Sequence, residues 1–265
     1  MKIAVFGDAS GNIQSINDFC IDLEKKSGSK VDLVLQVGDL TIPKKEKLRI
    51  DQNVHKTYSD YLDGTKTFKF PAVFVKGHSE DFDLLYSRTN HFIDKSCKIF
   101  YLVNGEIFEF KLKKERLVIG GLGGNRSGTR DWEGNTIGND KYFHKKELEG
   151  DRRRHFTIFE IEKLALQKRE IDILLLHDSP LGFGKRRIPN FDEDGNPLPT
   201  GAKELTELVE AVQPKITLFG HYNNFSGDHR INNTSVIGLN SMENNKKAVL
   251  ILDTVSWQYD ILDID

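Results

Sequence analysis

Short apolar runs alternate with amphipathic stretches along most of this chain. In the stretch 13–26, apolar residues recur at helical spacing, at Ile16, Phe19, Cys20 and Leu23. Apolar runs bounded by polar or glycine positions are typical of buried strands. The chain is therefore predicted to form helices at 13–26, 80–88, 157–168 and 202–212. It is predicted to form strands at 2–7, 31–37, 72–75, 171–176, 215–219, 248–252 and 255–262.

The middle of the chain predicts strands without intervening helices. The stretch 98–122 predicts three successive strands, with Asn104-Gly105 as a hairpin turn between the first two. The segments 120–138 and 182–201 are predicted as long loops, which in compact domains are often functional. Strand–helix alternation at both ends, with a β-meander between them, predicts a mixed α/β fold. We expect residues 1–265 to form a single domain.

Composition narrows the class of protein. With 265 residues, 38% of them hydrophobic and 29% charged, the chain can bury a substantial core. Its 38 basic and 40 acidic residues give a net charge of −2, which lends no support to nucleic-acid binding. No apolar stretch approaches the ~20 residues that span a bilayer, and Met1 leads straight into a strand without a signal peptide. We therefore expect a cytoplasmic protein with reduced, buried thiols at Cys20 and Cys97.

Aspartate and histidine residues gather where five of the predicted strands end. The carboxyl ends of strands in open α/β sheets are where ligand sites form. Carboxylate and neutral imidazole are the usual protein ligands of Mn, Fe and Zn, so the sequence predicts a metal centre at this edge. The segments are Phe6-Gly7-Asp8-Ala9-Ser10, Val37-Gly38-Asp39, Lys76-Gly77-His78-Ser79-Glu80-Asp81, Leu176-His177-Asp178 and Phe219-Gly220-His221-Tyr222-Asn223.

In this order the five segments resemble the motifs of the calcineurin-like metallophosphoesterases, D-x-H, G-D, G-N-H-[DE], H and G-H-x-H. The resemblance covers residues 3–223, and the stretch 162–180 is similar to the RNA lariat debranching branch of that family. It implies two mixed β-sheets sandwiched together and flanked by helices. It also implies a two-metal site that hydrolyses phosphate esters, in which two ions ~3.5–4 Å apart activate water and stabilise the leaving oxygen.

The resemblance assigns ligands to each ion, with Asp39 bridging the two. One ion would be held by Asp8 together with the second His of D-x-H and the last His of G-H-x-H. In this chain those two histidines are replaced by Ser10 and Asn223. Hydroxyl and amide oxygens are poor substitutes for imidazole. We expect this pocket to bind metal weakly or not at all.

The other ion would be held by Asp39, His177 and His221, and here His78 occupies the position of the family's Asn. Three imidazoles and a carboxylate predict one tightly bound Mn, Fe(II) or Zn ion. A shift of one residue would instead make His78 the family's catalytic histidine, and an outward-pointing His78 without metal is equally open. In the unshifted register Ser79 replaces the histidine that serves as general acid, a role worth typically ~10²–10⁴-fold in rate.

Basic and aromatic side chains on the long loops are candidates for substrate contacts. Lys185, Arg186 and Arg187 could meet a phosphate near the metal, with a solvated loop tip as the alternative. The run Arg152–Arg154 is expected to be surface charge. In the glycine-rich loop, Asn125-Arg126 and Arg130-Asp131-Trp132 could stack on a base. His229 could replace Asn223 as a ligand if its strand curls back.

These features predict a metal-dependent phosphoesterase, specifically a phosphodiesterase with a degenerate second metal pocket. Its substrate would be a phosphate ester, with nucleotides or RNA suggested by the debranching-like stretch. The alternative is a catalytically inactive member of the fold that binds a phosphate-containing ligand or a protein partner. The losses at Ser10, Ser79 and Asn223 favour that alternative. The sequence predicts no oligomeric state.

Overall fold

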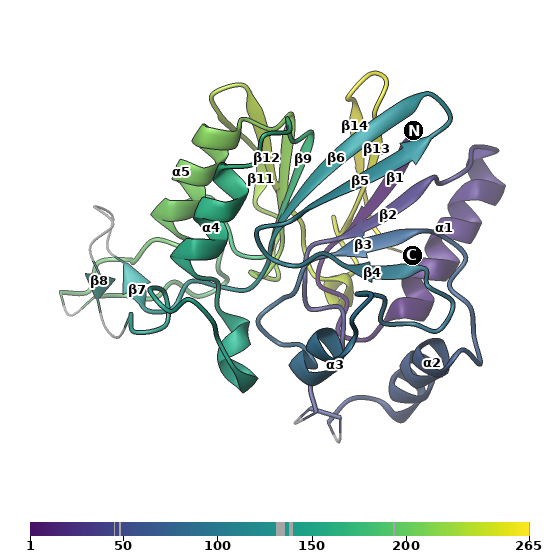
Figure 1. Cartoon of the computed structure of the whole chain (residues 1–265), viewed down its shortest axis with the longest axis horizontal. Helices are drawn as coiled ribbons and strands as arrows, with labels where there is room; N and C mark the ends of the chain where they lie inside the picture. The colour runs from purple at the N-terminus through teal and green to yellow at the C-terminus, as the bar shows by residue number, and fades with distance from the viewer. Residues whose placement is uncertain (45, 48, 131–135, 138–139, 193, 265) are drawn as a thin grey trace.

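Two six-stranded sheets pack face to face, and helices cover both outer surfaces (Figure 1). The computed structural model describes residues 1–44, 46–47, 49–130, 136–137, 140–192 and 194–264. This arrangement confirms the predicted fold of two mixed sheets flanked by helices. Within the described ranges, no helix is both long and apolar enough to cross a membrane.

The first sheet has the strand order β14-β13-β1-β2-β3-β4. Its four strands from β1 to β4 run parallel, whereas β13 is antiparallel to β1 and β14 to β13. The strands are β1 (Lys2–Phe6), β2 (Leu33–Gln36), β3 (Ala72–Phe74), β4 (Ile99–Tyr101), β13 (Val249–Asp253) and β14 (Tyr259–Leu262).

The second sheet has the order β11-β12-β10-β9-β6-β5. Its four central strands are parallel, and the two edge strands, β11 and β5, are antiparallel to their neighbours. The strands are β5 (Ile107–Leu112), β6 (Glu115–Leu122), β9 (Ile173–Leu176), β10 (Ile216–Phe219), β11 (Gly227–Ile231) and β12 (Thr234–Gly238). A separate ribbon pairs β7 (Thr129–Arg130) with β8 (Thr136–Ile137).

Helices flank the sheets on opposite sides of the molecule (Figure 1). Apolar residues of α1 (Ile13–Ser27) and α2 (Gln52–Asp63) pack on the first sheet, and those of α4 (Ile158–Ala165) and α5 (Lys203–Val212) on the second. The short helix α3 (Phe82–Ser87) packs against the 3-10 turn η1 (Gly150–Arg154), and a second such turn, η2, spans Met242–Asn244.

Strand alternation divides the buried side chains among three clusters. In β1, Ile3 and Val5 point into the core between the two sheets, whereas Ala4 and Phe6 point outward to α1. Leu175 of β9 is fully buried in the core between the sheets. Because successive residues of a strand face opposite sides, burial on both faces requires the continuous apolar runs seen in the sequence.

The predicted hairpin at Asn104-Gly105 is wrong, and with it the β-meander. β4 pairs in parallel with β3 of the first sheet, whereas β5 pairs with β6 of the second. Asn104-Gly105 therefore carries the chain from one sheet to the other. The Asn104 side chain anchors this crossing, because its oxygen accepts from Gly123 N at 2.7 Å and its amide donates to Gly123 O at 2.9 Å. A turn signal marks a change of direction but does not say which sheet the next strand joins.

Other predicted elements are confirmed, with local corrections. The strands β1, β2, β3, β9, β10 and β13 and the helices α1, α3, α4 and α5 lie where expected. The elements α2, β11 and β12 were not predicted, and the predicted loop 120–138 contains the end of β6 as well as β7 and β8. Both cysteines are free, but Cys97 is exposed rather than buried.

We expect Leu175→Ala to lower the free energy of unfolding by about 2–5 kcal/mol, because it opens a cavity where the two sheets meet. Urea denaturation followed by circular dichroism measures this. Leu166→Ala is the matched control, because the Leu166 side chain is 79% exposed and its loss should change stability by less than about 0.5 kcal/mol. Equal effects of the two substitutions would contradict the packing described for the core.

Candidate metal centre

Five loops meet at the carboxyl ends of the parallel strands of both sheets. The loops after β1, β2 and β3 of the first sheet carry Asp8, Asp39 and His78, and those after β9 and β10 of the second carry His177 and His221. The two sheets are joined here directly, because His177 Nδ1 donates a hydrogen bond to the Val37 carbonyl oxygen at 2.9 Å. Residues far apart in sequence thus share one site.

Three imidazole nitrogens and a carboxylate oxygen converge in what we name the histidine cluster, Asp39, His78, His177 and His221. His78 Nδ1 lies 3.0 Å from His177 Nε2, 3.2 Å from His221 Nδ1 and 3.0 Å from Asp39 Oδ2. His177 Nε2 lies 3.7 Å from the same Asp39 oxygen. The rings of His78 and His177 stack with centroids 5.3 Å apart.

The donor set fits a divalent cation. A carbonyl oxygen can only accept, so His177 carries its proton on Nδ1 and turns the lone pair of Nε2 toward the cluster. A single proton on His78 Nδ1 cannot satisfy all three neighbouring atoms. Ligands bound tetrahedrally at 2.0–2.1 Å from a common ion lie about 3.3 Å from one another, close to the spacings in this cluster. These residues could therefore hold a metal such as Zn, Fe or Mn.

A second group, Asp8 with Asp39 and His177, also brings its potential ligand atoms within 4.8 Å of one another. Both oxygens of the Asp8 carboxylate accept from the backbone N–H of His221, at 3.2 Å. We name Asp8, together with Ser10 and Asn223, the Asp8 pocket. Among the described residues it offers no imidazole of its own, because His177 already belongs to the histidine cluster.

Backbone geometry holds two ligands in unusual conformations. Asp39 has φ of 57° and His221 has φ of 71°, both in the left-handed region that residues other than glycine seldom adopt. Such strain persists only where the surrounding structure imposes it, and it is common at functional sites. Both turns place a ligand immediately after a strand, so the strain is consistent with a site that orients these side chains.

Glycines make room for the ligands at two positions. A Cβ atom at Gly38, where φ is 104°, would lie 2.4 Å from His177 Nδ1. A Cβ atom at Gly77 would lie 1.8 Å from Asp39 Oδ1. The glycines of the G-D and K-G-H segments therefore allow the backbone to approach the ligand side chains.

Glu80 joins the loops after β2 and β3. This buried carboxylate accepts from the backbone N–H groups of Leu40 at 3.0 Å, Thr41 at 2.8 Å and Gly77 at 2.9 Å, and from the Thr41 hydroxyl. Asp39 and His78 are neighbours of these groups in sequence. Glu80 thus fixes the two ligand loops relative to each other, a role that the family flank did not reveal.

Burial controls the protonation of the histidines. Desolvation lowers the pKa of His177 and of His221, to about 3 for His221, so both imidazoles are neutral and available as ligands. Burial acts in the same direction on His78, but its hydrogen bond to Asp39 and the charge of that carboxylate outweigh burial and raise its pKa.

The two aspartates are shifted in opposite directions. Burial acts to raise the pKa of Asp39, but the neighbouring His177 and His78 outweigh it and hold the pKa well below its usual range. Burial and then the charge of Asp39 raise the pKa of Asp8 well above its usual value. Two buried carboxylates side by side repel each other, and a cation between them would relieve that repulsion.

The positions that depart from the family motifs are Ser10, Ser79 and Asn223. Ser79 donates its backbone N–H to Asp39 Oδ1 at 2.7 Å, and Ser10 and Ser79 line a common pocket. Asn223 is exposed, and its carbonyl oxygen accepts from the Asn244 side chain at 2.9 Å. The structure thus brings Ser10 and Ser79 to one wall of the site.

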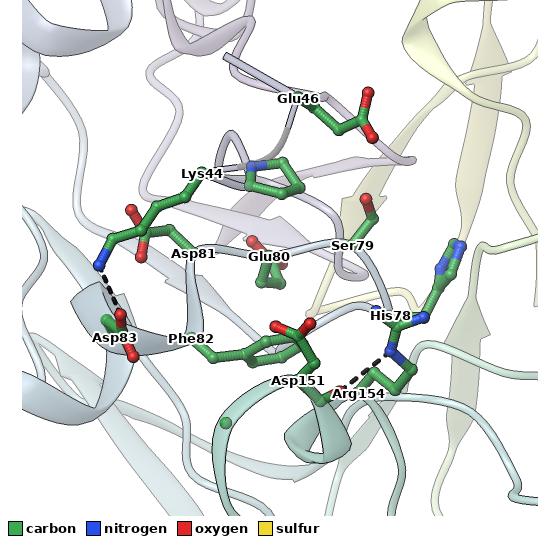
Figure 2. Close-up of a pocket in the computed structure, with 12 residues that line it drawn as sticks. Lys44, Glu46, His78, Ser79, Glu80, Asp81, Phe82, Asp83, Asp151 and Arg154 are labelled. Atoms are coloured by element: carbon green, nitrogen blue, oxygen red, sulfur yellow. Dashed lines mark hydrogen bonds and ion pairs between the residues drawn. The ribbon is translucent and has the colours of Figure 1, made fainter.

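A cleft of about 380 Å³ opens beside the cluster (Figure 2). Figure 2 shows His78, Ser79 and Arg154 near one end of the cleft, and Lys44 bonded to Asp83 at the other. Arg154 comes from η1, and its charge acts on the His78 imidazole. Arg152 and Arg154 are exposed, as expected for surface charge, but Arg154 also lines the cleft, a position for which the sequence offered no motif.

The basic loop after β9 contacts Tyr222, the residue next to His221. The Arg186 guanidinium lies 5.6 Å from the centre of the Tyr222 ring, and Tyr222 directly follows His221. Lys185 and Arg187 are exposed. Asp178 holds Tyr222 in place, because its carboxylate accepts from the Tyr222 hydroxyl at 2.5 Å. Sequence reasoning did not single out Asp178 or Tyr222.

Several other candidates lie away from the cluster or have structural partners. His229 is in β11, where Nε2 contacts the Ser226 carbonyl oxygen at 2.5 Å, rather than in the Asp8 pocket. Arg126 is buried, pairs with Asp140 and Glu204, and stacks on Phe143, so it is not a base-stacking residue. Asp131 and Trp132 lie outside the described residues.

Known proteins are similar to this chain in sequence and in fold. The sequence model of the calcineurin-like phosphoesterase family matches residues 1–224. The chain therefore belongs to the calcineurin-like phosphoesterase family, and this membership implies the use of a divalent metal.

Lariat debranching enzymes are among the chain's relatives. The enzyme of Arabidopsis thaliana is 24% identical over 83% of this chain and 54% of its own length. The enzyme of Drosophila pseudoobscura pseudoobscura is 27% identical over 83% of this chain and 42% of its own length. The chain thus spans about half the length of these relatives. Among solved structures, TT1561 of Thermus thermophilus matches with a TM-score of 0.58 and 14% identity over 100% of this chain and 99% of its own, which shows the shared fold.

We expect Glu80→Ala to lower the free energy of unfolding by at least about 2 kcal/mol, because three buried N–H groups lose their acceptor. It should also weaken metal uptake, since the two ligand loops are no longer tied together. Urea denaturation and a metal titration measure both effects. Asp83→Ala, which breaks an exposed ion pair on the same segment, is the control and should change neither. Unaltered metal affinity in Glu80→Ala would show that Glu80 does not position the ligands.

Proposed function

We propose that this chain is a metal-dependent phosphodiesterase with one well-formed metal site. The observation that carries the proposal is the convergence of His78 Nδ1, His177 Nε2, His221 Nδ1 and Asp39 Oδ2 beside an open cleft. The geometry of His78 supports its assignment as a ligand in the unshifted register. When bound, a divalent ion polarises a phosphoryl oxygen and lowers the pKa of a water molecule at the site.

The residues of the chain have distinct parts in this reaction. Asp39, His78, His177 and His221 hold the ion, and the neutral state of the buried imidazoles supports that role. Asp8 accepts a hydrogen bond from the attacking water or serves as a ligand of a weakly bound second ion beside Asp39. Arg186 lies where it can approach an outer part of a substrate, and we assign Lys185 and Arg187 to the same surface.

The substrate class we propose is a nucleotide or RNA phosphodiester. The enzymes to which the chain is similar debranch lariats, by their name, and the stretch 162–180 resembles the RNA lariat debranching branch of the family. Basic side chains on η1 and after β9 stand near the cleft and near Tyr222. The chain is not basic overall, so these local groups would have to provide the contacts to phosphate.

A second ion, in our proposal, binds weakly or only together with substrate. Ser10 and Asn223 replace two imidazoles in the Asp8 pocket, and Asn223 is exposed to solvent. Asp8 remains as a carboxylate ligand next to the shared Asp39. The expected stoichiometry is therefore one tightly bound ion per chain.

The losses at Ser10, Ser79 and Asn223 favour an alternative, a non-catalytic protein that binds a phosphate-containing ligand. The alternative shares the fold and the cleft but needs no turnover. Ser79 carries the argument, because a serine hydroxyl does not serve as a general acid near neutral pH. Turnover of an activated diester by the metal-loaded protein separates the two, because only the enzyme releases product.

We expect the protein loaded with Mn, Fe(II) or Zn to hydrolyse bis(p-nitrophenyl) phosphate and to stop when a chelator removes the metal. Asp39→Asn should lower kcat/KM by more than about 100-fold. Residues that only hydrogen-bond to metal ligands typically contribute ~10–100-fold, and a direct ligand should matter more. Release of nitrophenolate and elemental analysis of each variant measure this. His229→Ala, away from the cluster, is the control and should keep full activity. Equal activity of Asp39→Asn and the unmodified protein would refute metal catalysis at this site.

We expect the double variant Ser10→His with Asn223→His to take up a second ion, because it restores two imidazole ligands to the Asp8 pocket. Tightly bound metal should rise from about one to about two per chain. Elemental analysis after extensive desalting measures the stoichiometry. The matched control is Ser10→Ala with Asn223→Ala, which should leave it unchanged. A second ion already present in the unmodified protein would contradict the weak pocket.

A further inference from the structure

The cleft beside the histidine cluster contains two cationic side chains among the described residues that line it, Lys44 and Arg154. Lys44 forms an ion pair with Asp83, so its charge is neutralised at the far end of the cleft. Arg154 donates Nε to the Asp151 carbonyl oxygen at 3.0 Å. Among the described residues its terminal nitrogens have no carboxylate partner. Of the lining residues that the structure describes, Arg154 therefore provides the cation available at the His78 end of the cleft (Figure 2).

Hydrogen bonds tie the backbone at Arg154 and His155 to the segments around Asn125 and Lys76. Its carbonyl oxygen accepts from Asn125 N at 2.9 Å. The next carbonyl, of His155, accepts from the Lys76 ammonium group at 3.1 Å. Lys76 is fully buried and stands two residues before His78, at the end of β3. The arginine and the ligand loop are thus anchored to the same lysine.

Arg154 stands near the position where this chain lacks a charged group. Arg154 and Ser79 line the same cleft as His78, and Ser79 occupies the family's acid position. A serine carries no charge, so the negative charge that develops on a phosphoryl group during hydrolysis has no cationic partner at Ser79. A guanidinium presents paired N–H donors that match phosphoryl oxygens and keeps its proton at neutral pH.

From this arrangement we propose that Arg154 contacts a non-bridging oxygen of the phosphoryl group bound at the histidine cluster and stabilises its charge in place of the missing histidine. This inference rests on the proposed function. Arg154 transfers no proton. The oxygen of water adds to phosphorus and its proton passes to solvent, while the P–O bond to the leaving group breaks and the leaving oxygen takes a proton from solvent. Arginines that contact transferring phosphoryl groups act in this electrostatic way.

The test compares Arg154→Gln with Arg152→Gln, which removes a neighbouring charge on η1 that does not line the cleft. Binding of inorganic phosphate is measured by isothermal titration calorimetry, with and without Mn, and metal uptake by elemental analysis. We expect Arg154→Gln to weaken phosphate binding about 10-fold or more, the loss of a charge-assisted hydrogen bond. Arg152→Gln should bind phosphate like the unmodified protein, and metal uptake should be equal in all three.

Two further measurements complete the test: the phosphate affinity of Arg154→Lys and the rate of diester hydrolysis by the unmodified protein. The lysine variant keeps the charge but loses the paired donors, so its phosphate affinity should fall between those of the unmodified protein and Arg154→Gln. Phosphate affinity of Arg154→Gln within twofold of the unmodified protein, or no phosphate binding by the unmodified protein in either form, overturns the role of Arg154. Weakened phosphate binding in a protein that hydrolyses no diester would instead refute the proposed function alone.

Discussion

The hydrogen bond from His177 Nδ1 to the Val37 carbonyl oxygen is the interaction on which the site depends. It crosses from the end of β9 in one sheet to the end of β2 in the other. It also determines which nitrogen of His177 carries the proton, because a carbonyl can only accept. Nε2 is therefore directed with its lone pair at Asp39 and His78. One contact thus links the two sheets at the site and sets the protonation of a ligand, and Gly38 permits it by leaving space beside the imidazole.

The changes from the family motifs shift metal ligands from the Asp8 pocket to the histidine cluster. The histidine cluster has one more imidazole than the family pattern, at His78, whereas the Asp8 pocket has lost two, at Ser10 and Asn223. Asp8 and Asp39 remain adjacent and buried, so the pKa of Asp8 rises while that of Asp39 falls. In the function we propose, this balance gives a strong ion site at the histidine cluster and a weak one at the Asp8 pocket. Arg154 restores positive charge on the side where Ser79 removed it.

The convergence of the candidate metal ligands was predictable because strand ends and motif order carry information that survives without an alignment. Apolar runs located β1, β2, β3, β9 and β10. The Asp or His residue that follows each of these strands lies at the common edge. Arg154 was not predictable in the same way, because it ends a 3-10 turn far from any motif and is positioned through backbone contacts with Asn125 and, at His155, with Lys76. Glu80 was read only as part of a motif flank, although it joins two loops through three backbone N–H groups.

By itself the sequence determined the class of fold, the parallel strands with polar residues at their ends, and the set of side chains able to bind a metal. Periodicity and side-chain chemistry are local properties, so they can be read from the chain directly. Only the tertiary structure decided that Asn104-Gly105 crosses between sheets, that His229 stays in β11, and that Arg154 faces the cleft. These outcomes depend on which distant strands pair and which backbone groups remain to be hydrogen-bonded, and no local pattern encodes that choice.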